Sequence, residues 1–539
     1  MSGAPPEGFR GEPDAVRDEP AAPPEDSTIW RRVHKATPLI NAWKTLGIVV
    51  AVVLFNALDS LGPMLAEVQS LPLLQILVIA LAVVVVVVGF AFAFSWFSWR
   101  RMRYAVGEDA VYFHSGILFR NQRHARLNRI QGVDIIRPLL GRLVGLSAVN
   151  IETAGGAQSN IRVQFLKDDE AERLRAEVLG RAAGLRAAVR PGARPGEAPV
   201  YAQAPEREVY ALRVRDQLLS LVLSPLLVLA VVGLLTLIPA VLFTDSLWSL
   251  IAIIPASFAF AGALFTRFDS EFNFTLAISP DGLRLRHGLL STRAQTLPPG
   301  RIQAVRVSQP LLWRARDWWR VEVNVAGYGQ PTGNQEGNQQ RNVLVPVATR
   351  AEALNAIWLI LPDLGTADPD AVLAAALTGT LGDAGFLHSP PSARWVDPVK
   401  WRRNGLLITR TALIMRNGRL IRTVSIVPHE RTQSLAIQQG PWERRLGLAD
   451  FRADSVVGPV TTRSHHLPAP LASRILFEQA VRAREARAKE GPEEWMRRVG
   501  VAAPAAESPA AESPAAESPA AESPAAGSVA GSVAGPESR

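Results

Sequence analysis

The 539-residue chain contains no cysteine. This absence excludes disulfide bonds, thiolate metal sites and cysteine nucleophiles. The sequence also lacks a Gly-x-Ser-x-Gly elbow, a His-Glu-x-x-His pair and a glycine-rich phosphate loop that continues into Lys-Ser or Lys-Thr. His465 and His466 are adjacent, and neighbouring strand residues point to opposite faces, so we do not expect them to share a metal ion. The sequence therefore predicts no enzyme, no metal and no cofactor.

Charged residues are also missing from long hydrophobic segments. Residues 71–99, 218–243 and 247–266 contain no Asp, Glu, Lys or Arg, and each run is long enough for a membrane-spanning helix. The lack of charge inside the runs argues against an ion or proton pathway. We expect two transmembrane hairpins: residues 30–99 with spans at about 43–61 and 73–99, and residues 213–266 with spans at about 218–243 and 247–266.

Basic residues flank the outer ends of both hairpins. Arg100 and Arg101 follow the first, Arg213 and Arg215 precede the second, and the short connection Thr244–Ser246 has none. The positive-inside rule then places the outer ends of both hairpins in the cytoplasm. We therefore predict a multi-pass protein of the cell membrane with cytoplasmic N- and C-termini.

Outside the hairpins, the chain repeats one pattern three times. Each copy has a glycine (116, 288 or 418) followed thirteen residues later by the arginine of an Arg-x-Gln step. Internal similarity of this kind indicates a duplicated folding unit. Apolar and polar residues alternate with a period of two in each copy, which is typical of half-buried antiparallel strands, and a helical run ends the copy. The pattern predicts a small β-sandwich or open barrel of roughly seven strands with one C-terminal helix.

The order Gly, Arg-x-Gln, Pro, Gly-Leu and Ala-Gly resembles the bacterial pleckstrin-homology (PH) unit of the YdbS/YdbT-like membrane proteins. The resemblance covers about residues 30–487. It weakens in the third copy, where Thr432 replaces Ile and Val457-Gly458 replaces Ala-Gly. It implies an integral membrane protein in which α-helical transmembrane hairpins alternate with PH-like cytoplasmic domains of the β-sandwich or barrel type, each with a C-terminal helix. A second small membrane protein of the same family is a candidate partner.

The repeats, the hairpins and the composition together divide the chain into parts. Proline- and glycine-rich connectors and low-complexity ends, the latter predicted to be disordered, separate the units. The expected parts are a tail at 1–29, hairpin 1 at 30–99, PH-like domain 1 at 100–185, a linker at 186–212, hairpin 2 at 213–266, PH-like domain 2 at 267–363, a linker at 364–394 with one helical turn at about 371–377, PH-like domain 3 at 395–489, and a tail at 490–539.

The Arg-x-Gln step is the polar feature that all three copies share. Its arginine has two interpretations: a strut that caps backbone carbonyls or pairs with a carboxylate inside its own unit, or a contact to a lipid phosphate or acidic partner, which guanidinium binds in bidentate fashion. Further basic residues that could extend such a contact surface are Arg120, Arg123, Arg126, Arg314, Arg316 and Arg320. The candidate structural or interaction positions are Arg129, Gln131, Arg301, Gln303, Arg431 and Gln433.

Net charge indicates the kind of partner. Residues 1–29 carry a net −5 and residues 501–539 a net −4, which leaves +18 on the rest of a chain whose total is +9. A basic region beside membrane spans points to the bilayer and its anionic headgroups rather than to nucleic acid. We expect a non-enzymatic membrane protein whose PH-like domains form a binding or scaffold module for membrane-proximal partners or anionic lipid. The alternative is a small transporter or channel that these domains regulate. The third copy has no hairpin, so it must dock on the other units or on the membrane surface.

Overall fold

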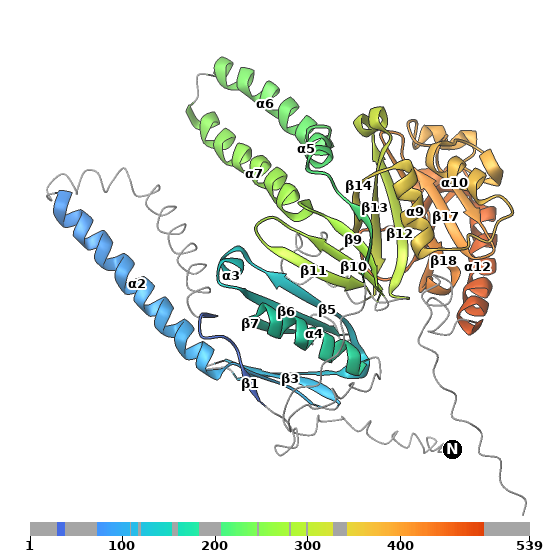
Figure 1. Ribbon diagram of the computed structural model, residues 1–539. Coiled ribbons are helices and arrows are strands. Elements are labelled where there is room, and N and C mark those ends of the chain that lie inside the picture. The colour runs from blue at the N-terminus through green and yellow to red at the C-terminus, as the bar shows by residue number, and fades with distance from the viewer. Residues whose placement is uncertain are drawn as a thin grey trace, which may run out of the picture. The chain divides into compact units, whose positions relative to one another are not determined.

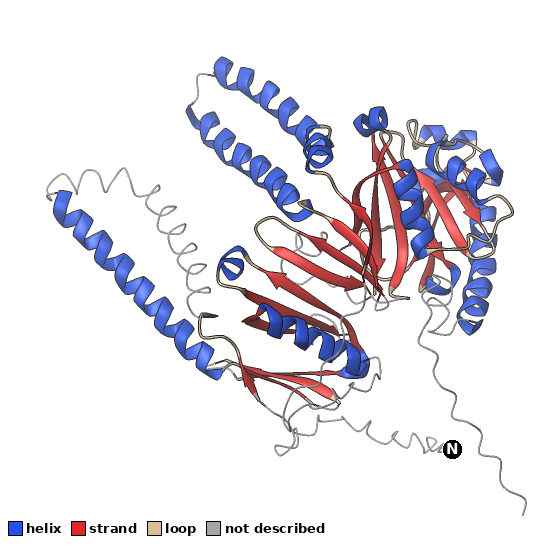
Figure 2. Ribbon diagram, viewed as in Figure 1, coloured by secondary structure: helices blue, strands red, loops and turns tan. Residues whose placement is uncertain are grey.

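The computed structural model describes residues 30–37, 73–107, 109–116, 120–153, 160–182, 206–244, 247–279, 282–297, 300–326 and 342–489. Both expected tails, the expected span at 43–61 and most of the 186–212 linker lie outside these ranges. The described part consists mainly of antiparallel β-sheets, with helices attached to them (Figures 1 and 2).

The first repeat forms four strands, then three strands, then a helix. The first four strands form one antiparallel sheet: β1 (Arg31–Arg32), β2 (Arg103–Val106), β3 (Ala110–Ser115) and β4 (Asn121–Arg126). The following elements are β5 (Ile130–Arg137), α3 (Leu139–Leu143), β6 (Leu146–Thr153), β7 (Ile161–Lys167) and α4 (Asp168–Ala182). Helix α4 packs on β5, β6 and β7 (Figure 1). This arrangement of seven strands and a closing helix is consistent with a PH-like domain.

The other two repeats follow the same order. The second contains β8 (Arg207–Ala211), β9 (Thr275–Ser279), β10 (Gly282–His287), β11 (Thr292–Leu297), β12 (Ile302–Pro310), β13 (Trp318–Val325), β14 (Val343–Thr349) and α9 (Arg350–Ile360). The third contains β15 (Leu387–His388), β16 (Gly405–Ile408), β17 (Ala412–Asn417), β18 (Ile421–Pro428), β19 (Ser434–Gln438), β20 (Leu448–Asp454), β21 (Arg463–Pro468) and α12 (Ala469–Lys489). In strands such as β10 and β13, successive side chains point to opposite faces of the sheet, which explains the alternation seen in the sequence.

Neighbouring repeats share their sheets. Strand β5 of the first repeat pairs with β11 of the second, and β12 of the second pairs with β18 of the third. Two seven-stranded sheets result, in the orders β7-β6-β5-β11-β10-β9-β8 and β14-β13-β12-β18-β17-β16-β15. Each therefore joins the last three strands of one repeat to the first four strands of the next. Pairing in this way covers sheet edges that would otherwise be open.

The hydrophobic segments are inserted within the repeats rather than between them. Residues 33–102 connect β1 to β2, and residues 212–274 connect β8 to β9, which are neighbouring strands of one sheet. The expected domain starts at residues 100 and 267 therefore leave out the first strand of each unit. Strand β1 has only two residues, which explains why no alternation revealed it.

Four helices occupy the described parts of these insertions: α2 (Leu73–Arg101), α5 (Val214–Val222), α6 (Pro225–Thr244) and α7 (Leu247–Glu271). The expected span at 218–243 is broken at Ser224, whose hydroxyl accepts a bond from the Leu227 amide at 3.2 Å, and Pro225 starts the next helix. Among the described residues, no single helix has the length and apolarity that a membrane span requires. One pair, Val214–Val222 with Pro225–Gly233, meets the requirement together and is bent by 42°.

The expected 364–394 linker contains a packed helix. Helix α10 (Pro369–Thr378) starts at Asp368, whose side chain accepts from the Ala371 amide, and it buries Leu373 and Ala376 in the core that units 2 and 3 share. Its C-terminal carbonyls accept hydrogen bonds from the buried guanidinium of Arg403. A cation at this end also interacts favourably with the helix dipole. The single turn expected at 371–377 is therefore part of a longer helix.

Candidate functional site

The Arg-x-Gln steps lie at corners between two sets of strands. In the first and third copies, the arginine ends a short 3-10 turn, η1 (Leu127–Arg129) or η5 (His429–Arg431), between the fourth and fifth strands. In the second copy, Arg301 follows a turn at Gly300 and immediately precedes β12. Gly300 has φ +73°, a conformation that glycine adopts without strain. The repeated motif thus marks the place where the chain leaves one sheet for another.

In the second copy, the glutamine side chain contacts the corner directly. Gln303 is buried, and its amide nitrogen lies 3.4 Å from the Gly300 carbonyl oxygen and 3.5 Å from that of Arg301. The Arg301 carbonyl also accepts a 2.9 Å bond from the Ala326 amide. The Arg301 side chain is half-buried. The carbonyls of the turn are therefore contacted by the Gln303 side chain and by the backbone amide that directly follows β13.

The first copy differs at the same corner. The Arg129 side chain is exposed, and the side chain of Gln131 lies outside what the structure describes. Nearby, Arg123 is tied to its own unit, because its guanidinium donates a 2.9 Å bond to the Asn160 carbonyl. Arg120 and Arg126 are exposed. The structure therefore leaves Arg129, Arg120 and Arg126 accessible to a partner.

In the third copy, Arg431 reaches towards the neighbouring unit. Its side chain is half-buried, and its Nη2 atom would lie 3.6 Å from a Cβ atom added to Gly300. Gln433 is exposed, while its amide donates a 2.8 Å bond to the Asp454 carbonyl. Arg487 of α12 donates a 2.6 Å bond to the Thr432 carbonyl. The three equivalent arginines thus have three different environments.

The basic residues of the second copy are largely engaged inside the protein. Arg314 donates to the Arg419 carbonyl of the third unit, and the Arg316 guanidinium lies 5.6 Å from the centre of the Trp318 ring. Arg320 Nη1 lies 2.6 Å from Glu271 Oε1 at the end of α7. Three arginines that were candidates for a contact surface therefore make contacts within the protein.

A chain of ion pairs that the sequence pattern did not predict starts at Arg320. Glu322 Oε2 accepts from Arg306 Nη2 at 2.6 Å, and Arg306 Nη1 donates to the Pro459 carbonyl of the third unit at 2.6 Å. Arg320 and Glu322 stand two residues apart on β13 and therefore share one face of the strand. The signal available in the sequence was opposite charges two residues apart. What covers that face could not be deduced from periodicity.

The buried carboxylate of Glu271 depends on its arginine neighbours. Its side chain is 6% exposed. Burial alone would raise its pKa, but the charges of Arg320 and Arg267 hold the pKa below its usual value. Arg267 Nε lies 3.5 Å from the same carboxylate oxygen. The C-terminal end of α7 is therefore tied to β13 by a buried carboxylate whose charge the two arginines favour.

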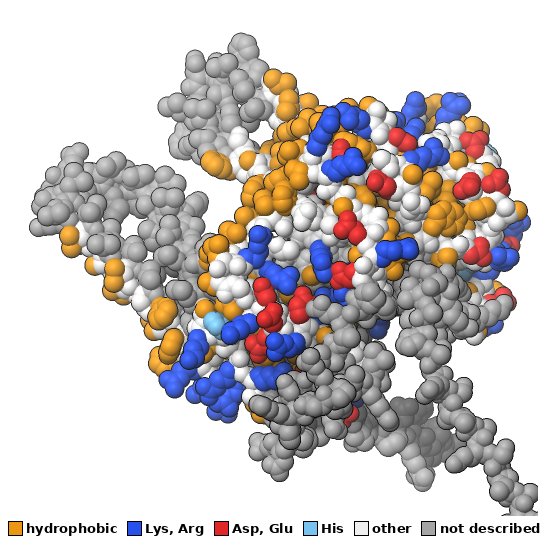
Figure 3. Space-filling view, viewed as in Figure 1, with side chains coloured by type: hydrophobic (Ala, Val, Ile, Leu, Met, Phe, Trp, Pro, Cys, Tyr) orange, Lys and Arg blue, Asp and Glu red, His pale blue; other side chains and the backbone are white. Residues whose placement is uncertain are grey.

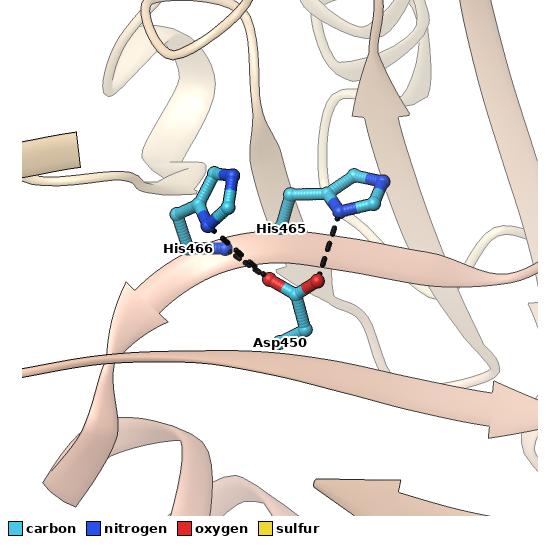
Figure 4. A group of neighbouring side chains, drawn as sticks. All are labelled: Asp450, His465 and His466. Carbon is cyan, nitrogen blue, oxygen red and sulfur yellow. Dashed lines mark hydrogen bonds and ion pairs between the residues drawn. The ribbon is translucent and has the colours of Figure 1, made fainter. Parts of the chain in front are cut away.

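His465 and His466 converge on one carboxylate, Asp450 of β20 (Figure 4). His465 Nδ1 lies 3.1 Å from Asp450 Oδ2, and His466 Nδ1 lies 3.5 Å from Oδ1. The expectation that the two rings point to opposite faces is wrong, because His466 has φ +55° and the β20–β21 register shifts between Ala449 and Phe451. Their ligand atoms all lie within 4.8 Å of one another, as a metal site requires.

The same carboxylate is already engaged by an arginine. Arg463 Nε donates a 2.7 Å bond to Asp450 Oδ2, the oxygen that also contacts His465. Burial would raise the pKa of Asp450, but hydrogen bonds from the His465 ring and the His466 amide, together with the charge of Arg463, hold the pKa at about 2. A cation bound here would have to displace or tolerate Arg463. The arrangement fits a network that joins β20 to β21 better than a metal centre.

Comparison with known proteins supports the repeated architecture. A family model described as "Bacterial PH domain" matches residues 60–182, 224–361 and 356–480. The UPF0699 transmembrane protein YdbT of Bacillus subtilis (strain 168) is 23% identical over 254 residues, which cover 43% of this chain and 51% of that protein. The chain thus spans about half the length of this relative. No solved structure matches the chain.

Proposed function

The chain belongs to the bacterial PH domain family and is YdbS/YdbT-like, and on this premise we propose that it is a multi-pass membrane protein. Its three PH-like units form a non-enzymatic binding or scaffold module at the cytoplasmic face, which engages membrane-proximal partners or anionic lipid. The matched relative is described as a transmembrane protein, which supports placing the hydrophobic insertions in the bilayer.

One structural observation carries the topology. Residues 212–274 leave the sheet after β8 and return to it at β9, where Tyr210 pairs with Leu276. Residues 33–102 do the same between β1 and β2, where Arg31 pairs with Tyr104. Because the two ends of each insertion belong to neighbouring strands, they lie on the same side of any membrane. Each insertion therefore crosses an even number of times, as a hairpin does, and the shared sheets keep all units on one side.

The surface composition supports a bilayer next to these insertions. On α2, the side chains of Val85, Val86 and Phe90 are 61%, 69% and 75% exposed. Figure 3 shows hydrophobic side chains over the described part of α5 to α7, with Lys and Arg side chains beside them. Exposed apolar surface of this kind marks contact with a membrane or a protein partner. Arginines at the outer ends of both hairpins favour the cytoplasmic side.

Single cysteines test the topology, since the chain has no cysteine of its own. We expect Ser246→Cys, in the connection of hairpin 2, to react with a membrane-impermeant maleimide in intact cells. Gln122→Cys on β4 and Gln438→Cys on β19 are both exposed in the structure, and we expect them to react only after permeabilisation.

The other outcomes are equally informative. Labelling of Gln122→Cys from outside, with Ser246→Cys protected, would reverse the orientation. Protection of all three positions in intact cells, followed by labelling of all three on permeabilisation, would show that hairpin 2 does not cross. Ion flux in proteoliposomes of the purified protein would favour the transporter alternative over the scaffold.

A further inference from the structure

The third unit has a short loop where the other two have their hydrophobic insertions. Strand β15 pairs with β16 through Leu387↔Leu406 and His388↔Gly405. In the first unit, Arg31↔Tyr104 and Arg32↔Arg103 make the equivalent pairs of β1 and β2. The connection between the two strands is residues 389–404 in the third unit and residues 33–102 in the first. Residues 389–404, which we call the 389–404 loop, therefore emerge from the sheet end that carries the hairpins in units 1 and 2.

The end of this loop matches the end of the first hairpin residue by residue. Trp99-Arg100-Arg101 stands four residues before the start of β2, and Trp401-Arg402-Arg403 stands four residues before the start of β16. The strand registers agree, because Arg103 pairs with His114 as Gly405 pairs with Arg416. In the first unit, this tryptophan lies in the last turn of α2, where an interfacial residue is expected. The third unit thus has the Trp-Arg-Arg segment that precedes the strand, but no hydrophobic insertion in front of it.

Apolar side chains of the loop are exposed. Trp395 is 74% exposed, Val399 47% and Val396 37%. Tryptophan prefers a membrane interface, where its ring is buried and its N–H stays hydrated. The exposed turn between β17 and β18 lies at the same end of the sheet, and its Leu420 is 63% exposed. The described part of the chain thus leaves several large apolar side chains exposed at this end of the sheet.

Basic side chains surround these apolar groups. The loop contains Arg394, Lys400, Arg402 and Arg403 against a single carboxylate, Asp397. The first three are exposed. The Arg394 guanidinium lies 5.4 Å from the centre of the Trp395 ring, and that of Arg402 lies 5.8 Å from the Trp401 ring. Basic residues near an anionic leaflet are attracted to its headgroups. The charge therefore complements anionic headgroups.

Hydrogen bonds hold the loop in shape. Asp397 Oδ1 accepts from the Lys400 amide at 3.0 Å, and Asp397 Oδ2 accepts from the Asn404 side chain at 3.2 Å. Ser389 is bound to the His465 carbonyl at 2.8 Å, and the buried Arg403 is bound to the end of α10. The exposed tryptophan is therefore displayed by a fixed backbone, which reduces the entropy lost on binding.

We propose that the 389–404 loop is a membrane-interface anchor, which inserts Trp395, Val396 and Val399 among the headgroups of an anionic bilayer. It would hold the hairpin-free third unit against the same leaflet as units 1 and 2. The inference rests on the proposed function, because it needs the hairpins to place the units beside a membrane.

The test uses the full chain in vesicles of phosphatidylcholine and phosphatidylglycerol, with an NBD fluorophore on a single cysteine. A nitroxide group on the lipid acyl chains quenches NBD only when the fluorophore enters the bilayer interface. We expect Val396→Cys to lose most of its NBD emission in nitroxide vesicles. Gln438→Cys, exposed on β19 of the same unit, is the matched control and should keep its emission.

A third position separates failure of the inference from failure of the proposed function. Val85→Cys on α2 should be strongly quenched if this hairpin lies in the bilayer. Quenching at Val85 without quenching at Val396 would overturn the anchor and leave the membrane topology intact. No quenching at Val85 would overturn both. A blue shift at Val396 without quenching would show that protein rather than lipid covers the position, and it would also overturn the anchor.

Charge variants test the lipid class. We expect the combined change Arg394→Gln, Lys400→Gln and Arg402→Gln to reduce quenching at Val396 in anionic vesicles, and vesicles of phosphatidylcholine alone to reduce it in the parent protein. Arg474→Gln removes an exposed charge from α12 of the same unit and should leave the quenching unchanged. Equal quenching of the parent and the triple variant would refute recognition of anionic lipid.

Discussion

The two junctions between repeats differ although both are made by strand pairing. At the first, β5 and β11 pair only from Ile135 to Arg137, and Arg142 adds a 2.8 Å bond to the Leu289 carbonyl. At the second, β12 and β18 pair from Val305 to Pro310, and the buried Asn324 side chain donates a 2.8 Å bond to the Val460 carbonyl of the third unit. A hydrophobic cluster runs from Tyr210 to Ile426 through units 2 and 3, whereas the cluster of unit 1 ends within that unit.

The difference predicts that the three repeats unfold as two cooperative groups. Units 2 and 3 share a core, so we expect them to unfold together. Unit 1 has its own core and a short ladder, so it should open separately, as partly independent units of a protein do. Each repeat has the same strands, so the junctions differ in the length of the strand ladder and in the shared hydrophobic core, to which polar side chains of β12 and β13 add further contacts at the second junction.

The largest effect is expected from Arg320→Ala. The change leaves the buried Glu271 carboxylate with Arg267 as its remaining ion-pair partner, at 3.5 Å. Loss of one partner of a buried pair costs about 3–5 kcal/mol. Hydrogen exchange of the full chain should accelerate in β12–β14 and β16–β18, and β5–β7 should stay unchanged. Arg316→Ala, at an exposed position, is the control. Equal acceleration in all three units would show that unit 1 shares the core after all.

A smaller effect is expected at the contact between Asn324 and the loop before β21. The buried Asn324 side chain donates to the Val460 carbonyl at 2.8 Å and accepts from the Val460 amide at 2.8 Å. Asn324→Ala leaves these backbone groups unpaired, at a cost of about 1–3 kcal/mol. Exchange should accelerate in β19–β21, and the β12–β18 ladder should persist.

Gly458 provides the matching test of this contact. A Cβ atom at Gly458 would lie 2.2 Å from Asn324 Oδ1, so Gly458→Ala alone should destabilise the third unit. In the Asn324→Ala background, the obstructing amide is gone, and the same change should cost less. A double-mutant cycle measures this coupling. Additive effects of the two changes would contradict the contact.

Several features could be predicted from the sequence because they depend on local pattern. Repeated Gly and Arg-x-Gln spacing identified three units, and period-two alternation identified most strands. Sharing of sheets between repeats could not be predicted, because alternation shows which face is buried but not which edge pairs. The first strands were missed because β1 and β15 have two residues each and because a long insertion separates β1 and β8 from the rest of their units.

The candidate positions show the same limit. The motif located the corners between sheets, but the environments of its arginines depend on neighbouring units, as Arg431 beside Gly300 shows. The two histidines converge on Asp450 because His466 adopts a positive φ. This backbone conformation could not be predicted from the residue type. The ion pairs of Arg320 and Glu322 could not be predicted either, because alternation shows which residues share a face of a strand but not what covers that face.

The smallest effect on stability is expected at Arg129, and it separates the two interpretations of the repeated arginine. Arg129 is exposed and Arg301 is half-buried. Removal of an exposed cation changes the free energy of unfolding by less than about 1 kcal/mol. Arg129→Ala should therefore leave hydrogen exchange in β5–β7 nearly unchanged, while Arg301→Ala should accelerate exchange in β12–β14. If Arg129 is instead a contact, its loss should weaken a salt-sensitive association with anionic vesicles, because exposed charges are screened. Marked acceleration of β5–β7 exchange in Arg129→Ala would make the residue a strut despite its exposure.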